Sequence, residues 1–434
     1  MSIINGKSIH RKLDLNDIKN LGVNIKKDFC ISCDLKIQEI LEMIIRFPKK
    51  ITDSEINNLL KCLVDMGFDE KYSKKVILFA FNCFSKEYIF KRFENEFKTY
   101  SPFEEEKKNC YITEQFVPLG ILFHITASTS PISPLISLLE GLLTGNVNVL
   151  KISSRGNMFL EKFIELFLKY NPYLKKYIHV LDIPSCEKTM IKEMISIADG
   201  VVVWGADKTV NDIKKMTSPN QKLIIWGHKI SFAYISHKNI YNKNDLENIC
   251  ADICVSNQLA CNAPQNILVE TSCKEDLIEI TKLLDQCMKK ISKHYGYIQP
   301  DIHEQSEITT QVMLAKSYQI LGEKFVIEGE NNDWNIITSF EYGFKPSPLF
   351  RTILIFPVNK NEVIKQLFPM RNYLQTAIVS CKNDELNDIK KILFHAGVTK
   401  ICRPGNSHNI YFGEPHDGVY SLRCLVKRVS ANLE

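Results

Sequence analysis

The loop around Cys261 is the part of this chain whose residues most clearly suggest covalent chemistry. It covers residues 254–265 and reads Cys-Val-Ser-Asn-Gln-Leu-Ala-Cys-Asn-Ala-Pro-Gln, between a predicted helix over 245–254 and a predicted strand over 266–270. The neighbours of the cysteine are small, and a loop between two regular elements is a usual place for a reactive side chain. Since a thiolate is a strong nucleophile, we predict that Cys261 forms a covalent intermediate. The loop by itself leaves open a buried, inert thiol.

Three polar corners follow predicted strands in the middle of the chain. They are residues 151–155 (Lys-Ile-Ser-Ser-Arg), 204–207 (Trp-Gly-Ala-Asp) and 226–229 (Trp-Gly-His-Lys). Ligands of open α/β sheets bind at the carboxyl ends of the strands, so these corners are candidates for a binding site. The sequence contains no G-x-G-x-x-G, so the usual dinucleotide fingerprint is absent.

The elements that must position these corners alternate between short apolar strands and helices, which favours a parallel sheet covered by helices on both faces. Strands are expected at residues 116–126, 146–150, 177–181, 200–204 and 222–226, and helices at 131–143, 158–170, 187–197 and 208–216. After the Cys261 loop the alternation resumes and predicts a second α/β domain. Its expected helices are 274–291, 362–367 and 385–395, and its expected strands are 324–327, 352–356 and 376–380. The first 110 residues are expected to be mostly helical, because apolar side chains recur at helical spacing over 54–66 and 75–97.

Composition and charge indicate a globular protein of more than one domain. The chain has 434 residues, and its net charge of +5 is small against 55 basic and 50 acidic side chains, so nucleic acid is not an expected partner. No secretory signal and no run of about 18 apolar residues is visible, so no membrane span is expected. A content of 14 cysteines without an export signal favours a reducing compartment, and we predict a cytoplasmic location. Residues 30–33 form the only C-x-x-C, and no metal site is predicted there.

Several short motifs occur in a fixed order along the chain. They are Pro118-x-Gly120-x-x-x-His124-Ile125, the segment 142–146 (Leu-Leu-Thr-Gly-Asn) leading to Lys151, Trp226-Gly227-His228-Lys229, Asn257-Gln258-x-x-Cys261 and His416-Asp417-Gly418. Together they resemble the aldehyde dehydrogenase superfamily. More closely, they are similar to the long-chain acyl-CoA reductase family (LuxC), the reductase subunit of the bacterial bioluminescence fatty acid reductase.

The resemblance covers residues 111–430 and implies an aldehyde dehydrogenase-like α/β fold. The implied organisation is a mostly helical N-terminal region over 1–110, a Rossmann-like cofactor domain over 111–255, a catalytic domain with the nucleophilic cysteine over 256–412, and a C-terminal tail over 413–434. The tail is expected to take part in oligomerisation, so a homo-oligomer is the expected assembly.

The same resemblance assigns roles to particular residues. Cys261 is the implied nucleophile with Gln258 just before it, and Thr129 takes the place of the asparagine that holds the oxyanion in the superfamily. Cofactor contacts are implied for the residues at the ends of three strands: Lys151, Gly205 and Gly227.

Departures from the superfamily pattern bear on the chemistry. Ile225 stands where hydrolytic members carry a general-base glutamate, which fits an enzyme whose acyl intermediate should not be hydrolysed. A threonine at 129 offers a shorter donor, so the Cys261 backbone N–H is expected to carry more of the oxyanion stabilisation. Ala206 replaces the usual serine or threonine, which removes one contact near the phosphates. The candidate groups for activating the thiolate are basic: His124, His228 and Lys229.

The expected cofactor is NADPH, with NADH less favoured. Lys151 and Arg155 bracket Ser153 and Ser154, and two cations with hydroxyls suit a 2′-phosphate. NAD-preferring members often carry a glutamate at the place of Ser154, whereas a serine removes that repulsion. A solvated Arg155 without a ligand is the alternative.

The resemblance thus implies reduction of long-chain acyl-CoA, or of an acyl group from a partner acyl-protein synthetase, to a fatty aldehyde that serves bioluminescence. The reaction would pass through an acyl group on Cys261 and a hydride from NADPH. Two other interpretations stay open. One is an acylating dehydrogenase for short acyl-CoA that works with NADH, and the other is a nucleotide-binding scaffold that has lost catalysis. The preferred length of the acyl chain tests the short-chain dehydrogenase interpretation. Transfer of an acyl group to Cys261 tests the scaffold interpretation.

Overall fold

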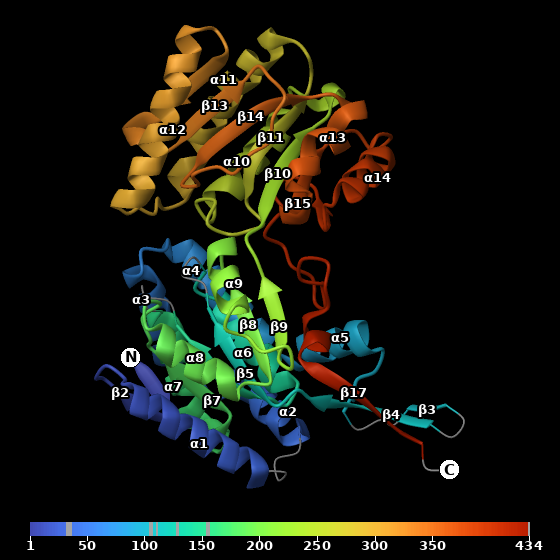
Figure 1. Ribbon diagram of the computed structural model, residues 1–434. Coiled ribbons are helices and arrows are strands. Elements are labelled where there is room, and N and C mark those ends of the chain that lie inside the picture. The colour runs from blue at the N-terminus through green and yellow to red at the C-terminus, as the bar shows by residue number, and fades with distance from the viewer. Residues whose placement is uncertain (32–36, 104–106, 110–111, 127–129, 153–156, 433–434) are drawn as a thin grey trace. The chain divides into compact units, whose positions relative to one another are not determined.

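The computed structural model describes residues 1–31, 37–103, 107–109, 112–126, 130–152 and 157–432 (Figure 1). The chain divides into two compact units. The first comprises residues 1–66, 73–227 and 410–434, and the second comprises residues 67–72 and 228–409. The roles predicted for the four sequence segments stay predictions. Residues 228–255, expected in the cofactor segment, lie within the second unit.

A seven-stranded sheet forms the centre of the first unit, with the order β2-β1-β7-β6-β5-β8-β9. The strands from β7 to β9 in this order run parallel. Their bounds are β1 Ser2–Ile4, β2 Lys7–Ile9, β5 Ile121–Ile125, β6 Val147–Lys151, β7 Ile178–Leu181, β8 Gly200–Trp204 and β9 Lys222–Trp226. Strands β5, β6 and β7 are buried along their whole length, which explains why they read as continuous apolar runs.

Helices of the first unit share one core with the N-terminal region. The bounds are α1 Leu15–Ile31, α2 Ile37–Arg46, α3 Asp53–Asp65, α4 Glu70–Cys83, α5 Lys86–Phe97, α6 Ser133–Leu143, α7 Met158–Tyr170, α8 Lys188–Ile197 and α9 Asp207–Lys214. Residues 70–72 at the start of α4 belong to the second unit. Helix α1 packs on α8 and α3 packs on α7 (Figure 1). The ring of Phe47 lies 4.8 Å from that of Phe167 and 5.4 Å from that of Phe163, centroid to centroid. The N-terminal helices therefore pack onto the sheet layer through α7.

The strand expected over residues 116–126 is wrong as a single element. The chain forms two strands there, β4 Ile112–Pro118 and β5, which belong to different sheets. Between them Gly120 adopts a φ of 131°, which a residue with a side chain rarely adopts. Strand β4 instead pairs antiparallel with β17 Val426–Asn432 and with β3 Lys107–Asn109. The end of the chain thus completes a small sheet with β4, and its predicted oligomerising role stays a prediction.

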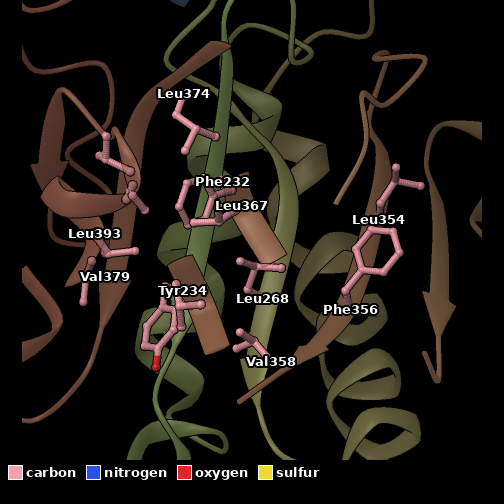
Figure 2. Packing of buried hydrophobic residues seen from close by; sticks show 14 of the residues in the cluster. Phe232, Tyr234, Leu268, Leu354, Phe356, Val358, Leu367, Leu374, Val379 and Leu393 are labelled. Carbon is pink, nitrogen blue, oxygen red and sulfur yellow. The ribbon is translucent and has the colours of Figure 1, made fainter. Parts of the chain in front are cut away.

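A second seven-stranded sheet forms the centre of the second unit, with the order β12-β13-β14-β11-β10-β15-β16. Its neighbouring strands are parallel except for β12 and β13. The bounds are β10 Ile230–Ile235, β11 Pro264–Glu270, β12 Lys324–Glu328, β13 Asn335–Ser339, β14 Thr352–Val358, β15 Leu374–Ser380 and β16 Lys400–Cys402. Figure 2 shows Phe232 and Tyr234 of the interior strand β10 beside Leu268 of the neighbouring strand β11 in the core on one face.

Both faces of this second sheet are covered by helices, as the sequence predicts for a parallel sheet. Helices α10 Lys243–Cys254 and α11 Lys274–Ile291 contribute to one core cluster. Helices α12 Ile302–Ile320, α13 Val363–Leu367 and α14 Leu386–Ala396 contribute to the other. Helix α12 was not expected, because it buries only Ile308, Val312 and Ala315 and its apolar stripe is thin.

Candidate active site

Cys261 lies near the end of the loop that follows α10 and leads into β11. Its side chain is exposed and is not part of a disulfide. The hydroxyl of Ser231, at the start of β10, donates to the Cys261 carbonyl oxygen at 2.6 Å and accepts from the Thr376 backbone N–H at 3.1 Å. One hydroxyl thus ties the cysteine backbone to two neighbouring strands of the central sheet, so that the thiol is presented from a fixed position.

Gln258 fixes the shape of this loop. Both Asn257 and Gln258 adopt positive φ angles, 52° and 62°, which cost energy for residues other than glycine. The Gln258 side chain is buried, and its Nε2 donates across the loop to the Pro264 carbonyl oxygen at 2.9 Å. The Asn257 Nδ2 donates to the Gly296 carbonyl oxygen at 3.1 Å. Because the Gln258 amide faces the loop backbone, we infer that it positions Cys261.

A side chain that the sequence did not indicate contacts the thiol. The Nε2 of Gln375, on β15, donates to the Cys261 Sγ at 3.3 Å. A hydrogen bond to sulfur favours the charged thiolate over the neutral thiol, because the charged form accepts the stronger bond. Gln375 is 114 residues from Cys261 in the chain, so only the pairing of β10 with β15 brings it near.

Replacement of Gln375 by methionine, which keeps the volume and removes the donor, is expected to raise the pH at which Cys261 reacts. A hydrogen bond to a charged group is worth about 1.5–3 kcal/mol, so reactivity at neutral pH should fall about ten- to a hundredfold. The rate of iodoacetamide labelling against pH, read residue by residue from peptide masses, measures this. Exposed Cys186 of the first unit is the internal reference, and its labelling should not change. An unchanged pH profile at Cys261 would show that Gln375 does not support the thiolate.

A buried carboxylate holds the far side of the loop. Asp252 of α10 accepts hydrogen bonds from the backbone N–H groups of Gly405 at 2.7 Å and Ser407 at 3.3 Å. The Ser407 carbonyl oxygen in turn accepts from the Nδ2 of Asn262, the residue after the cysteine, at 2.8 Å. Burial raises the pKa of Asp252 to about 6, although these hydrogen bonds act in the opposite direction. Asp252 therefore connects α10 to the cysteine loop through the segment 405–407.

Residues 67–72 belong to the second unit although their neighbours in the chain belong to the first. They approach the cysteine loop through Gly296, since a Cβ built on that glycine would lie 3.0 Å from the Asp69 Cβ. Burial raises the pKa of Tyr72 to about 12, and the nearby Cys261 thiolate adds to this shift. Tyr72 is thus a neighbour of Cys261, and no motif in the sequence marks it.

Lys151 lies at the carboxyl end of β6 in the first unit, as expected. Its side chain is 3% exposed, and its Nζ donates to the Ile152 carbonyl oxygen at 3.2 Å and to the Ser185 Oγ at 3.3 Å. Burial lowers its pKa. An ammonium group has three N–H donors, and two of its acceptors lie among the described residues. This donor set fits a ribose hydroxyl or a phosphate oxygen of a nucleotide.

The two predicted cofactor glycines end neighbouring strands of the same sheet. The Gly205 N–H donates to the Trp226 carbonyl oxygen at 3.2 Å, which joins the ends of β8 and β9. A Cβ added at Gly227 would meet no atom within 4 Å, so the fold itself leaves open space there. Ile225, one residue before Trp226, is 44% exposed. The predicted site residues Thr129, Ser153 and Arg155 lie outside the described residues.

Two of the basic residues proposed to activate the thiol, His124 and Lys229, form hydrogen bonds with other groups. Burial lowers the pKa of His124 to about 4, so its ring is neutral near pH 7. In the first unit its Nε2 is 3.0 Å from the Asn148 Oδ1, and its Nδ1 is 2.7 Å from the Ser137 Oγ. Lys229 of the second unit donates from its Nζ to the Asn372 carbonyl oxygen at 3.0 Å. With both ring nitrogens engaged, His124 is a core residue.

In the part of the chain that the structure describes, no group of three or more His, Cys, Asp or Glu side chains could hold a metal ion. No helix among the same residues is long and apolar enough to cross a membrane. None of the cysteines with described side chains is part of a disulfide. The C-x-x-C at 30–33 includes residues outside the described part, so its predicted lack of a metal stays a prediction.

The fold of the chain is similar to that of known enzymes. The aldehyde dehydrogenase KauB from Pseudomonas aeruginosa aligns with a TM-score of 0.77 over 100% of this chain and 96% of its own, at 14% identity. A glyceraldehyde-3-phosphate dehydrogenase, GapN from Methanocaldococcus jannaschii, solved in complex with NADP, aligns with a TM-score of 0.73 over 98% of this chain and 96% of its own, at 16% identity. The fold is therefore that of the aldehyde dehydrogenases, and the predicted fold class is confirmed.

Relatives by sequence narrow this class to one family. A long-chain acyl-protein thioester reductase of Aliivibrio fischeri is 26% identical over 74% of this chain, and one of Vibrio harveyi is 27% identical over the same share. The chain spans 65% of the length of each of these two proteins. A third, from Photobacterium leiognathi, is 23% identical over 97% of this chain and 88% of its own length. The chain belongs to the acyl-CoA reductase (LuxC) family, whose model matches residues 32–428, and the predicted family is confirmed.

Proposed function

We propose that this protein reduces long-chain acyl thioesters to fatty aldehydes, with Cys261 as the nucleophile. The observation that carries the proposal is the exposed Cys261 thiol, held by Ser231 and contacted by the Gln375 amide, within a chain of this family. An exposed thiol that accepts a hydrogen bond and sits on a fixed loop has the properties of a nucleophile. A buried, inert thiol would not be accessible to a substrate.

The reaction divides into two transfers at the acyl carbon. In the first, the Cys261 thiolate attacks the carbonyl carbon, the bond from that carbon to the donor sulfur breaks, and the acyl group stays on Cys261. A bound reduced nicotinamide supplies the hydride for the second transfer. The resulting oxyanion then expels the Cys261 thiolate, which leaves an aldehyde. We propose that the Cys261 backbone N–H, together with Thr129, stabilises the oxyanion in both steps, and that Gln375 stabilises the thiolate each time it forms.

NADPH is the proposed cofactor. Support comes from the buried Lys151 ammonium at the carboxyl end of β6, and from the sequence of the following residues, which adds Ser153 and Arg155. Two cations with hydroxyls suit a 2′-phosphate. One enzyme of the same fold was solved with NADP. NADH has no 2′-phosphate with which these cations could pair.

The acyl donor is proposed to be a long-chain acyl-CoA or an acyl group held as a thioester on a partner protein. The relatives are called long-chain acyl-protein thioester reductases, which supports the second donor. The same attack by Cys261 serves either thioester. An acyl-protein synthetase as partner, a homo-oligomeric assembly and the use of the aldehyde in bioluminescence stay predictions from the resemblance.

Incubation of the protein with tetradecanoyl-CoA and NADPH should give tetradecanal, detected as a hydrazone by mass spectrometry, and free CoA in equal amount. Butyryl-CoA and NADH in the same assay test the alternative of a short-chain, NADH-dependent enzyme. Faster turnover with tetradecanoyl-CoA and NADPH supports the proposal. Faster turnover with butyryl-CoA and NADH would replace it with the alternative, and acyl transfer without any aldehyde would refute the reductase function.

A further inference from the structure

We propose that Trp204, supported by Trp226 and His416, forms the surface on which the nicotinamide ring of the cofactor binds in the first unit. This inference rests on the proposed function and adds to it a site for one half of the cofactor. In this arrangement Trp204 contacts the ring, while His416 is a positioning residue that keeps the Trp204 indole in place.

Three rings meet at the carboxyl ends of β8 and β9. The centroids of Trp204 and Trp226 are 5.6 Å apart, and the His416 ring lies 5.3 Å from Trp204 and 4.8 Å from Trp226. Trp226 is 6% exposed and packs into a core cluster, whereas Trp204 is half-buried and sits at the edge of that cluster. Rings at these separations stabilise one another. Trp226 is therefore the buried ring of the group, whereas Trp204 and His416 are partly exposed beside it.

The indole of Trp204 is also held along its edge. Its Nε1 donates to the Ser137 Oγ of α6 at 3.1 Å. Trp204 and Trp226 are direct partners in the parallel pairing of β8 with β9. With its polar edge bonded and its backbone in the sheet, the indole has a fixed plane, which suits stacking with a flat ligand.

The motif His416-Asp417-Gly418 gains a physical explanation from this contact. His416 and Val419 exchange two backbone hydrogen bonds, at 2.9 and 2.8 Å, and the two residues between them have φ angles of 48° and 80°. Two successive positive φ angles define a tight hairpin turn for which Asp-Gly is a preferred pair. The aspartate and the glycine are thus accounted for by the turn. The His416 side chain is not required by the turn, and the turn directs it onto the tryptophans.

The location favours the nicotinamide ring over other flat ligands. Ligands of parallel sheets bind at the carboxyl ends of the strands, and each tryptophan here is followed by a glycine, Gly205 or Gly227, which leaves the backbone accessible. Lys151 ends β6, which is two strands from β8 in the same sheet, so the two ends are roughly 10 Å apart. A dinucleotide can span this distance with its ribose and phosphates at Lys151 and its second ring at Trp204.

Cofactor binding by the full-length protein tests this assignment without any need for turnover. NADPH and NADH absorb where tryptophan emits, so binding can be followed by energy transfer. We expect His416→Ala to weaken NADPH binding about two- to tenfold. Trp204→Ala should weaken it about five- to a hundredfold. His416→Phe, which keeps a ring, should bind NADPH like the wild type. The adenosine half of the cofactor should bind to all variants with the same affinity. The ligand for this test is 2′,5′-ADP, or ADP if the wild type binds NADH better than NADPH.

Two control variants separate the site from its surroundings. Trp334→Phe changes a buried tryptophan of the second unit, and Val419→Ala shortens an exposed side chain of the same turn while its backbone bonds remain. Both should bind NADPH as the wild type does. Unchanged NADPH affinity in both His416→Ala and Trp204→Ala would overturn the inference, and so would equal losses for NADPH and for the adenosine half. A wild-type protein that binds neither NADPH nor NADH would instead refute the proposed function itself.

Discussion

Cys261→Ala is expected to take up no acyl group and to form no aldehyde. In enzymes with a covalent nucleophile, removing that nucleophile lowers turnover by about 10⁴-fold or more, because the whole covalent route is lost. The loop itself should persist, since Cys261 is exposed and the hydrogen bond from Ser231 goes to its backbone carbonyl oxygen. Incubation with labelled tetradecanoyl-CoA in the absence of cofactor, followed by intact and peptide mass analysis, should show one acyl group on Cys261 in the wild type and none in the variant.

Two other exposed cysteines provide the matched controls. Cys186 lies in the first unit and Cys273 in the second, and both are free and exposed. Alanine at either position should leave acylation and aldehyde formation close to the wild-type values. Label that remains on the Cys261→Ala protein would contradict the assignment and would move the nucleophile to another cysteine. A wild-type protein that takes up no label would favour the scaffold interpretation.

Local signals in the sequence predicted most of the elements, because short buried strands and amphipathic helices have clear periodicity. The helix over 274–291 and the strands over 200–204 and 222–226 were predicted with the bounds that the structure gives. The hairpin of β1 and β2 was missed although its turn, Asn5-Gly6, is a strong hairpin signal with positive φ angles of 51° and 71°. The single strand over 116–126 failed because its apolar run continues through the break at Gly120.

The surroundings of the cysteine were less predictable than the cysteine itself. Cys261 and Gln258 belong to one motif, so a single stretch of sequence indicated both. Gln375 and Ser231 come from separate strands, and only the sheet order places them at the cysteine. No local pattern encodes such contacts, since each side chain alone is an ordinary polar residue in an apolar strand. Long-range pairing therefore decides which polar groups surround the nucleophile.

The persistence of the acyl group on Cys261 is the property that most separates a reductase from a hydrolytic relative. Water can remove the acyl group only if a base activates it, and general-base help is worth about 10² to 10⁴ in rate. We therefore expect that Ile225→Glu speeds hydrolysis of the acyl-enzyme by up to this factor and diverts product from aldehyde to acid. Gas chromatography of acid and aldehyde from the same sample, with NADPH present, measures the ratio of the two products.

The position can accept a carboxylate without harm to the fold. On β9 the neighbours Ile224 and Trp226 are each 6% exposed, whereas Ile225 is 44% exposed and points away from their core. Strand β9 also ends the sheet order, so a charged side chain there lies on an edge strand. Substitutions at such exposed positions usually change stability by less than about 0.5 kcal/mol. Thermal unfolding of the variant should therefore match that of the wild type.

Ile225→Gln is the matched control, because glutamine has the size of glutamate and cannot act as a base. It should fold, acylate and reduce like the wild type and give no additional acid. Acylation, measured as CoA release in the first turnover, should be similar in all three proteins, since the attack by Cys261 does not involve residue 225. Two results would refute the argument: a wild-type acyl-enzyme that hydrolyses within one catalytic turnover, or a folded and acylated Ile225→Glu protein that yields no more acid than Ile225→Gln.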